Sequence, residues 1–394
     1  MVLPTSRKLK IGVAGLGRAF TVMLPTLSRD PRVELAAAAD PRQEARLKFE
    51  SDFRGKSYSS VEELCKDPAV DVVYIATPHQ FHAEQARLAA SHGKHLLVEK
   101  PMALSLEECR GMIEAARKAG VVLIVGHSHS FDRPVLQARK MIEQGAVGKV
   151  RMITALNFTD FLYRPRRPEE LDTERGGGAV FNQGAHHIDI IRLLGGGRVK
   201  SVRAATGVWD AARPTEGAYS CLLSFEDGAF ATAVYSGYAH FDSDEFVGWI
   251  GEMGQKKDPG QYGSARKILR SGADELSLKS ARNYGGPDFT PPDEKLLHQH
   301  FGPLIVSCEK ADLRPLPSGV MVYTDTERRL DPLPPSAVPR ATVIDELYDA
   351  VVNGGAPLHS GEWAAATMEV CLAILRSARE QKEVALQNQI ALRT

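Results

Sequence analysis

Short apolar runs alternate with amphipathic stretches over the first 126 residues of the chain. Ser60 and Ser105 each precede a glutamate by three residues, which is the capping-box signal for the start of a helix. Strands and helices that alternate in this way are typical of βαβ units, whose parallel strands are covered on both faces. We therefore expect a doubly wound α/β domain over residues 1–127. The predicted strands are residues 10–14, 33–39, 71–76, 95–98 and 121–125.

After Gly126 the pattern changes to consecutive strands joined by short turns, which favours an antiparallel sheet. We expect residues 128–394 to form an α+β domain with a large, mainly antiparallel open sheet and a C-terminal helix at about 360–380. Residues 252–296 are rich in Gly, Pro, Lys and Asp, and we interpret them as a long excursion from that sheet, either a lid or an oligomer arm. Because one face of an open sheet is usually covered, we also expect a homodimer or homotetramer.

Composition excludes several classes of protein. Lys+Arg and Asp+Glu are equal at 49 each, so no global charge draws the chain to nucleic acid or anionic lipid. No run of apolar residues is long enough to span a membrane, and the first ten residues lack the apolar stretch of a signal peptide. The five cysteines are scattered and form no CxxC, as expected of reduced thiols in a cytoplasmic protein.

A glycine-rich turn follows the first predicted strand and opens a helix. Gly15 and Gly17 would let the backbone approach a pyrophosphate at the helix N-terminus, with Arg18 and Ala19 beside it. Phe20 occupies the third position of GxGxxG, where a small residue is usual. Asp40 ends the second strand at the spacing of a ribose-binding carboxylate, which predicts a Rossmann domain that binds NAD, whereas Arg42 leaves NADP open. The competing interpretation is that the glycines only shape a turn and Asp40 caps the next helix.

Three further segments follow in order along the chain. Together with the glycine turn they resemble the glucose–fructose oxidoreductase/inositol dehydrogenase (Gfo/Idh/MocA) family, and this resemblance covers the whole chain. It implies a nicotinamide-dependent oxidoreductase in which Thr77 to His82 line the nicotinamide side of the cofactor. The segments are Thr77-Pro78-His79 with His82, Glu99-Lys100-Pro101, and the GGGAVFNQGAHHID stretch with Gly176 to Gly178, Asn182, His186 and Asp189.

The same resemblance assigns catalytic roles. It implies that Lys100 reaches the reacting oxygen, aimed by a cis Pro101, and that His186 is the catalytic histidine. Many members of the family have an aspartate four residues before this histidine, where the present chain has Asn182. An amide can orient a hydroxyl group but cannot accept a proton, so the base would be His186 or Lys100. His187 is a further candidate, although neighbours on a helix point about 100° apart.

An arginine cluster precedes the GGG stretch and suggests an anionic substrate, because arginine binds carboxylates in bidentate fashion. The competing interpretation is a solvated basic loop paired with Glu169, Glu170 and Asp172. The whole pattern is similar to the branch of phthalate 4,5-cis-dihydrodiol dehydrogenases, which implies oxidation of a carboxylated cis-dihydrodiol to a catechol. A sugar or polyol substrate is the alternative. The candidate substrate-binding residues are Arg133, Arg164, Arg166, Arg167, Arg175 and His187.

Two other classes of function compete with an oxidoreductase: a metal-dependent hydrolase and a non-catalytic NAD-binding sensor. Histidine pairs such as His127 and His129 raise the possibility of a metal-dependent hydrolase, but no zinc-ligand spacing can be completed, so we expect no metal. A non-catalytic NAD-binding sensor would explain Asn182, but the retained Lys100 and His186 argue against it.

Overall fold

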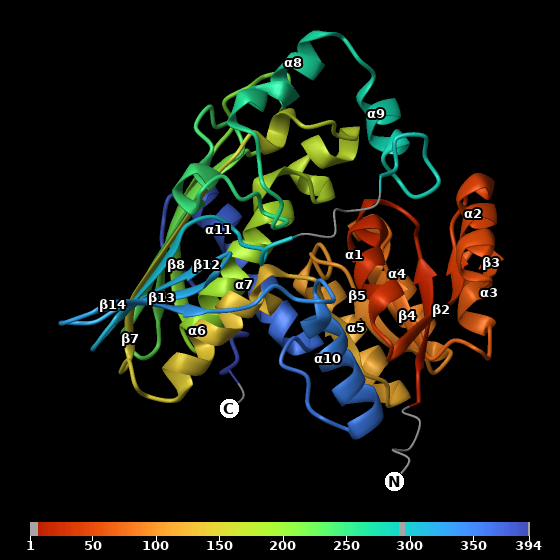
Figure 1. Ribbon diagram of the computed structural model, residues 1–394, viewed down its shortest axis with the longest axis horizontal. Helices are drawn as coiled ribbons and strands as arrows, with labels where there is room; N and C mark the ends of the chain where they lie inside the picture. The colour runs from red at the N-terminus through yellow and green to blue at the C-terminus, as the bar shows by residue number, and fades with distance from the viewer. Residues whose placement is uncertain (1–6, 291–295, 393–394) are drawn as a thin grey trace. The chain divides into compact units, whose positions relative to one another are not determined.

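In a computed structural model that describes residues 7–290 and 296–392, the early apolar runs form a six-stranded parallel sheet. Its strand order is β3-β2-β1-β4-β5-β6, which confirms the doubly wound α/β prediction (Figure 1). The short strand β3 was not predicted, because its three residues contain no apolar run. The strands are β1 (Leu9–Ala14), β2 (Val33–Ala39), β3 (Lys56–Tyr58), β4 (Val72–Ile75), β5 (His95–Val98) and β6 (Leu123–Val125).

Helices cover this sheet and begin where the sequence predicted. Ser60 accepts a hydrogen bond from the Glu63 amide, and Ser105 forms a complete capping box with Glu108. All four residues of β4 are buried, as expected for a strand between two helical layers. The order of the strands reverses between β1 and β4, and ligands of doubly wound sheets bind at the carboxyl ends of the strands at such a point. The helices are α1 (Arg18–Arg29), α2 (Gln43–Phe53), α3 (Val61–Lys66), α4 (His82–Ser91) and α5 (Leu106–Ala119).

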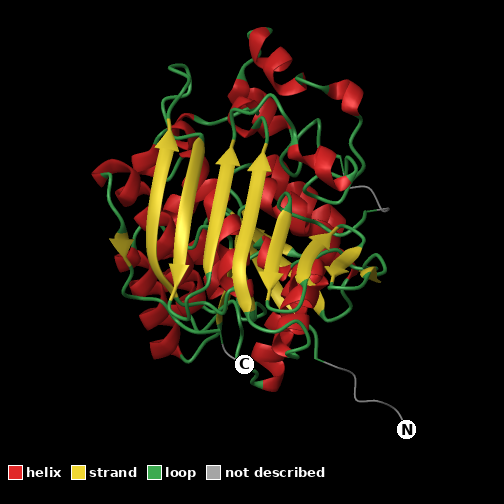
Figure 2. Cartoon of the chain, turned by 90° about the vertical axis from the view of Figure 1, so that its left-hand side faces the viewer, coloured by secondary structure: helices red, strands yellow, loops and turns green. Residues whose placement is uncertain are grey.

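A second sheet has nine strands in the order β14-β13-β12-β11-β7-β10-β9-β8-β15. Only β7 and β10 pair in parallel among its strands, so the expectation of a mainly antiparallel sheet is confirmed. Figure 2 views it from the face without helices. The strands are β7 (Val150–Phe158), β8 (Val199–Gly207), β9 (Ala218–Phe225), β10 (Phe230–Ser236), β11 (Leu304–Cys308), β12 (Asp312–Leu316), β13 (Gly319–Tyr323), β14 (Arg328–Pro332) and β15 (Val384–Ala385).

The other face of the nine-stranded sheet packs against helices. Helix α6 contacts β12 and β13, and α7 contacts β7 and β10. In the described part of the chain, no helix combines the length and the apolar character needed to cross a lipid bilayer. The remaining helices are α6 (Arg133–Glu143), α7 (Ala185–Leu194), α8 (Ser264–Arg270), α9 (Glu275–Ala281), α10 (Ala341–Tyr348) and α11 (Gly361–Glu380).

The chain divides into two compact units. Residues 1–127 share the first unit with 279–292 and 337–364, whereas the second comprises 128–278, 293–336 and 365–394. The predicted excursion is thus split: its residues 252–278 belong to the second unit, and its residues 279–290 belong to the unit of the parallel sheet. Two stretches used in the sequence analysis, 1–6 at the N-terminus and 291–295 at the end of the excursion, lie outside the described residues.

Candidate active site

The glycine turn of the first unit has the backbone geometry that a dinucleotide requires. Gly15 has φ +92°, and a Cβ atom there would lie 3.0 Å from the carbonyl oxygen of Ala76. A Cβ atom at Gly17 would meet nothing within 4 Å, so the space in front of the turn is open. Gly17 is also the N-cap of α1 and no side chain caps this end of the helix. These features fit a pyrophosphate at the helix N-terminus.

Asp40 is tied to this turn and to Arg42. Its carboxylate accepts the Leu16 amide at 2.8 Å and forms a bidentate ion pair with the Arg42 guanidinium at 3.0 and 3.1 Å. The Arg42 amide donates to the same carboxylate, and Nη2 of Arg42 reaches the carbonyl oxygen of Leu16. Asp40 therefore orders the turn rather than capping α2, whose N-cap is Arg42, and it does so at the position where a ribose-binding carboxylate belongs.

Phe20, the departure from GxGxxG, is fully buried in the first unit. Its ring packs edge-on against Tyr284, with ring centroids 5.2 Å apart, and also contacts Phe49 at 6.5 Å. The large side chain is therefore accommodated between α1, α2 and the segment 279–292. No local signal in the sequence indicated Tyr284 as its partner.

The loops after β4 and β5 are joined by His82. Its two ring nitrogens lie 3.0 Å from the Pro101 carbonyl oxygen and 2.9 Å from that of Thr77, and burial lowers its pKa. His82 thus holds the Thr77 loop to the segment that contains Lys100. Glu99, beside Lys100, is buried and accepts the Tyr74 hydroxyl at 2.6 Å, and burial raises its pKa.

Lys100 itself is partly exposed, and the Lys100–Pro101 peptide bond is cis, as expected. Thr77, Pro78 and His79 are also partly exposed at the carboxyl end of β4, whereas Arg18 is exposed and Ala19 partly exposed at the start of α1. The elements therefore present these side chains at the strand ends where a cofactor is expected. Their direct contacts with a cofactor stay predictions.

In the second unit, Asn182 holds the glycine-rich loop. Its Nδ2 donates to the carbonyl oxygens of Gly176 and Gly178, at 3.3 and 2.8 Å. An aspartate at this position would place a negative charge against the same two carbonyl oxygens. Gly178 has φ +82°, and a Cβ atom there would overlap the carboxylate of the buried Glu216.

His186, near the start of α7, belongs to a cluster of aromatic rings. Its ring meets that of His129 edge to face, with centroids 4.7 Å apart and an interplanar angle of 69°. Phe301 lies 5.2 Å from both rings. The side chains of His186, His129 and Phe301 are all buried. The cluster therefore places the predicted catalytic histidine in a largely dry environment.

His129 is held between two carboxylates. Its Nδ1 lies 2.6 Å from Asp132, and its Nε2 lies 3.3 Å from Glu252. Burial alone would lower the pKa of His129, but these two carboxylates more than offset burial and raise it to about 9. His129 is therefore a buried cation at neutral pH. The sequence analysis missed this trio: only the His129-x-x-Asp132 spacing is local, since Glu252 is 123 residues further along the chain.

His187 has the opposite environment. Its Nδ1 lies 3.0 Å from the Tyr219 hydroxyl, its ring packs 5.3 Å from Phe301, and it borders a small cavity of about 20 Å³ lined mainly by apolar side chains. Burial lowers its pKa to about 3. His187 is therefore a neutral, buried residue that faces Tyr219, which favours a structural role over substrate binding.

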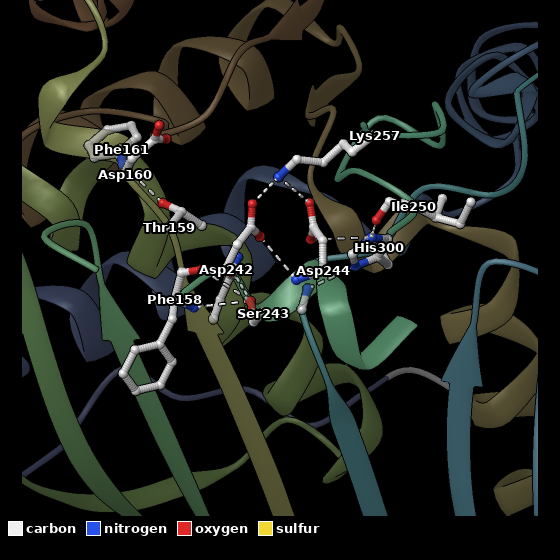
Figure 3. A network of polar contacts seen from close by, with 12 residues as sticks. Phe158, Thr159, Asp160, Phe161, Asp242, Ser243, Asp244, Ile250, Lys257 and His300 are labelled. Atoms are coloured by element: carbon white, nitrogen blue, oxygen red, sulfur yellow. Dashed lines mark hydrogen bonds and ion pairs between the residues drawn. The ribbon is translucent and has the colours of Figure 1, made fainter. Parts of the chain in front are cut away.

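A network of polar contacts joins the segments that contain Asp242, Lys257 and His300 (Figure 3). Lys257 reaches between Asp242 and Asp244, at 2.8 Å from the latter. His300 lies beyond Asp244, accepts the Gly302 amide and donates to the Ile250 carbonyl oxygen at 2.8 Å. The His300 amide in turn donates to the carbonyl oxygen of Glu252. His300, which precedes Phe301, is thus hydrogen-bonded to the backbone of both Ile250 and Glu252.

Asp189, the last residue of the GxHxxD stretch, joins three elements of the second unit. It accepts hydrogen bonds from Ser130 and, at 2.9 Å, from Thr367 of α11. Thr367 also accepts from the fully buried Arg192 at 2.7 Å. These contacts give Asp189 a structural role on the helix that carries His186.

The arginines of the predicted substrate cluster divide into two kinds. Arg166 is largely buried, stacks 3.6 Å over the Phe161 ring and donates to the Phe161 carbonyl oxygen. Arg167 pairs with Glu169 at 3.1 Å and with Glu170 at 3.5 Å. Both are therefore engaged within their own loop, as the competing interpretation predicted for the cluster.

Arg164 differs because 44% of its side chain is exposed. Its Nε pairs with Asp160 at 3.0 Å, and the described residues include no partner at hydrogen-bond distance for its two Nη groups. The partial burial of Arg164 lowers its pKa, but the attraction of Asp160 and Glu252 outweighs this effect, so the pKa of Arg164 is raised. Arg164 is thus a charged arginine whose Nη groups are available as hydrogen-bond donors, and it lies in the electrostatic field of Glu252. Arg175 is exposed on its loop, and Arg133 at the start of α6 donates to the Pro334 carbonyl oxygen.

Among the residues that the structure describes, no group of three or more His, Cys, Asp or Glu side chains is arranged to hold a metal ion. The five cysteines are all unpaired thiols.

Comparison with known proteins agrees with this geometry. Residues 9–127 match the model of an oxidoreductase family with an NAD-binding Rossmann fold (GFO/IDH/MocA), and residues 135–255 match the C-terminal domain of the same family. A 1-carboxy-3-chloro-3,4-dihydroxycyclohexa-1,5-diene dehydrogenase of Comamonas testosteroni is 47% identical over 380 residues, covering 95% of this chain and 96% of the relative. A trans-1,2-dihydrobenzene-1,2-diol dehydrogenase of Danio rerio is 32% identical over 51% of this chain and 60% of its own length.

Solved structures agree as well. One from Bordetella bronchiseptica RB50 has a TM-score of 0.91 and 43% identity, and the match covers 96% of this chain and 100% of that one. The WlbA dehydrogenase of Bordetella pertussis, solved with NADH and UDP-GlcNAcA, has the same fold with a TM-score of 0.68 and 22% identity over 97% and 99% of the two chains. The chain therefore belongs to the GFO/IDH/MocA family of NAD-binding oxidoreductases.

Proposed function

We propose that this oxidoreductase converts a carboxylated cis-dihydrodiol of an aromatic ring into the corresponding catechol. The observation that carries the proposal is the similarity along nearly the whole chain to the Comamonas testosteroni dehydrogenase, whose named substrate is a carboxylated dihydroxycyclohexadiene. The matched myo-inositol 2-dehydrogenase of Thermotoga maritima is 32% identical over only 50% of this chain, which makes a polyol the weaker candidate.

The reaction oxidises one carbinol carbon of the diol. When bound, NAD accepts the hydride from that carbon. His186 or Lys100 takes the proton of the hydroxyl group, and the hydroxy-ketone that results tautomerises to the catechol. Because the gain of aromaticity drives this last step, the demand on the base is modest. Asn182 then has no proton to accept, in keeping with its bonds to Gly176 and Gly178.

Arg164 is the arginine we assign to the carboxylate of the substrate. Its exposed guanidinium retains both Nη groups, and a guanidinium edge with two such donors matches a carboxylate. Arg166 and Arg167 serve instead to hold the loop that presents Arg164, through Phe161, Glu169 and Glu170. We also propose that the protein is cytoplasmic, because its thiols are unpaired, and that its open sheet face assembles a homodimer or homotetramer.

A substrate panel tests the proposed reaction. Formation of NADH is followed with phthalate 4,5-cis-dihydrodiol, a benzene cis-dihydrodiol without carboxylates, myo-inositol and glucose. We expect kcat/KM for the carboxylated diol to exceed that for the benzene diol about 100-fold, since a charged hydrogen-bonded contact contributes about 1.5–3 kcal/mol. Preference for inositol or glucose would replace the proposal by the polyol alternative. Absence of turnover with every diol would favour the NAD-binding sensor.

Two substitutions test the assigned residues. Lys100→Met should lower kcat about 1000-fold and leave NADH binding nearly unchanged, because it removes a group that acts on the reacting oxygen.

Arg164→Met should raise KM for the carboxylated diol about tenfold or more without affecting the benzene diol. Arg110→Met is the matched control, because Arg110 is an exposed arginine of α5. Unchanged turnover in the first variant, or equal effects of the two arginine substitutions, would remove these roles.

A further inference from the structure

The motif ARNYGG, residues 281–286, has no role in the proposed reaction. It lies in the part of the excursion that packs with the first unit. Tyr284, at its centre, is fully buried. Its ring contacts Phe20 of α1 edge-on at 5.2 Å, stacks on Phe53 of α2 at 6.3 Å, and meets Phe289 at 5.5 Å. The segment is therefore part of the core next to the cofactor turn.

Polar and backbone contacts fix this segment on α2. The Tyr284 hydroxyl donates to Asp52 at 2.5 Å, and the Lys48 ammonium lies 5.6 Å from the centre of the Tyr284 ring. Gly285 has φ +81°, and a Cβ atom there would lie 3.1 Å from Cα of Ala45. The backbone of the segment thus runs directly along the helix that begins one residue after Arg42.

Arg42 joins this segment to the cofactor turn. Its Nη1 donates to the carbonyl oxygen of Tyr284 at 3.3 Å, and its Nη2 donates to that of Leu16 at 2.9 Å. Nε and Nη2 also form the bidentate pair with Asp40. A guanidinium has five N–H donors, so these bonds leave one donor of Arg42 unused.

We infer that residues 281–286 act as a strap that selects NAD over NADP by holding Arg42 on Asp40. A ribose 2′-hydroxyl is neutral and can accept the remaining N–H of Arg42 without displacing it. A 2′-phosphate brings a charge close to −2 against Asp40, and the one remaining N–H of Arg42 cannot offset this repulsion. A bidentate pair between Arg42 and the phosphate would require Arg42 to leave Asp40, Leu16 and Tyr284. Loosening the strap should therefore release Arg42 toward the phosphate.

The test measures cofactor binding to the full-length protein without substrate, by titrating the fluorescence of NADH and of NADPH. We expect the wild-type Kd for NADPH to exceed that for NADH about 100-fold. In Tyr284→Ala the ratio should fall at least tenfold, and adding Arg42→Ala should abolish the gain in NADPH binding. Tyr284→Phe, which keeps the ring, should retain most of the discrimination. Tyr262→Ala, which changes an exposed tyrosine of the same excursion, is the control.

Three results would overturn the inference: equal affinity of the wild type for both cofactors, an unchanged ratio in a folded Tyr284→Ala protein, or a gain in NADPH binding that persists without Arg42. If Tyr284→Ala does not fold, Tyr284→Leu keeps more of the buried volume and should still lower the ratio at least threefold. Because no substrate is present, these outcomes are independent of whether the diol is oxidised.

Discussion

Two histidines of the second unit pack against the ring of Phe301 in opposite electrical surroundings. His129 lies between the carboxylates of Asp132 and Glu252 and is cationic at neutral pH, whereas the Nδ1 of His187 faces the Tyr219 hydroxyl and burial keeps this imidazole neutral. Both are buried to the same degree. Burial alone therefore does not decide the charge of an imidazole here; the groups opposite its two nitrogens do. His186 contacts the cationic ring and precedes the neutral one in sequence.

The largest expected effect comes from removing the ring that both histidines share. Phe301→Ala should lower the free energy of unfolding by about 3–5 kcal/mol, because it opens a cavity beside three imidazoles. Urea denaturation measures the loss. Phe246→Ala is the control, since 54% of Phe246 is exposed, and it should cost less than about 1 kcal/mol. Similar losses in the two variants would show that Phe301 does not support the cluster.

The next largest effect is expected from removing a carboxylate that faces the cationic His129. Asp132→Asn should lower the free energy of unfolding by about 3 kcal/mol at pH 6, because it removes one carboxylate from a buried cation. The pKa of His129 is raised from its ordinary 6.5 to about 9, so its stabilisation is complete below pH 6.5 and is lost as the pH rises through 9.

Urea denaturation across this range follows the pH dependence. The wild type should lose on the order of 3 kcal/mol between pH 6.5 and 9 from this group. Asp132→Asn should lose much less over the same range. Parallel curves for the two proteins would mean that His129 is neutral throughout.

The neutral side of the comparison predicts the opposite dependence on pH. The pKa of His187 is lowered to about 3, so the folded protein resists its protonation and loses stability as the pH falls below 6.5. At pH 7.5, His187→Phe should cost about 1 kcal/mol through the lost bond to Tyr219. At pH 5 the variant should gain about 2 kcal/mol relative to wild type, which reverses their order. Chemical denaturation at the two pH values measures this, and an unchanged difference would contradict it.

The smallest effect on the free energy of unfolding is expected from a substitution on the open sheet face. It tests whether the contrast between His129 and His187 depends on assembly of the subunits. Leu222 is 44% exposed on β9, in the open sheet. Leu222→Glu should change the free energy of unfolding of the subunit by less than about 0.5 kcal/mol but convert the proposed oligomer to a monomer in sedimentation velocity. The pH signatures of His129 and His187 arise within one chain and should persist in that monomer. A wild type that sediments as a monomer would refute the proposed assembly.

Much of the fold could be predicted because its signals are local. The apolar runs of β1, β2, β4, β5 and β6, and the serine caps of α3 and α5, each depend on residues a few positions apart. Strand β3 escaped because Lys56–Tyr58 carries no apolar pattern and is defined by its pairing with β2. The fate of the excursion also escaped, because composition indicates a loop but not what the loop packs against.

In the candidate site too, residues of local motifs could be predicted and residues brought together by the topology could not. Gly15, Gly17 and Lys100 lie in short motifs of neighbouring residues that can be read from the sequence alone, so they could be identified. The neighbours that set the electrostatics around His186 could not be identified, because Glu252 and Phe301 reach the cluster only through the topology of the second unit. Arginine spacing likewise predicted a basic loop but not that Arg164 has the most exposed side chain of Arg164, Arg166 and Arg167.

The composition of the first unit has a consequence for the order in which the protein matures. Its glycine turn is synthesised long before Tyr284 and the stretch 337–364, which belong to the same unit. Translation must therefore pass residue 364 before this unit has all its parts, by which time nearly all of the second unit has also been made. The nascent chain therefore cannot complete its cofactor domain before most of the segments of the second unit have been made.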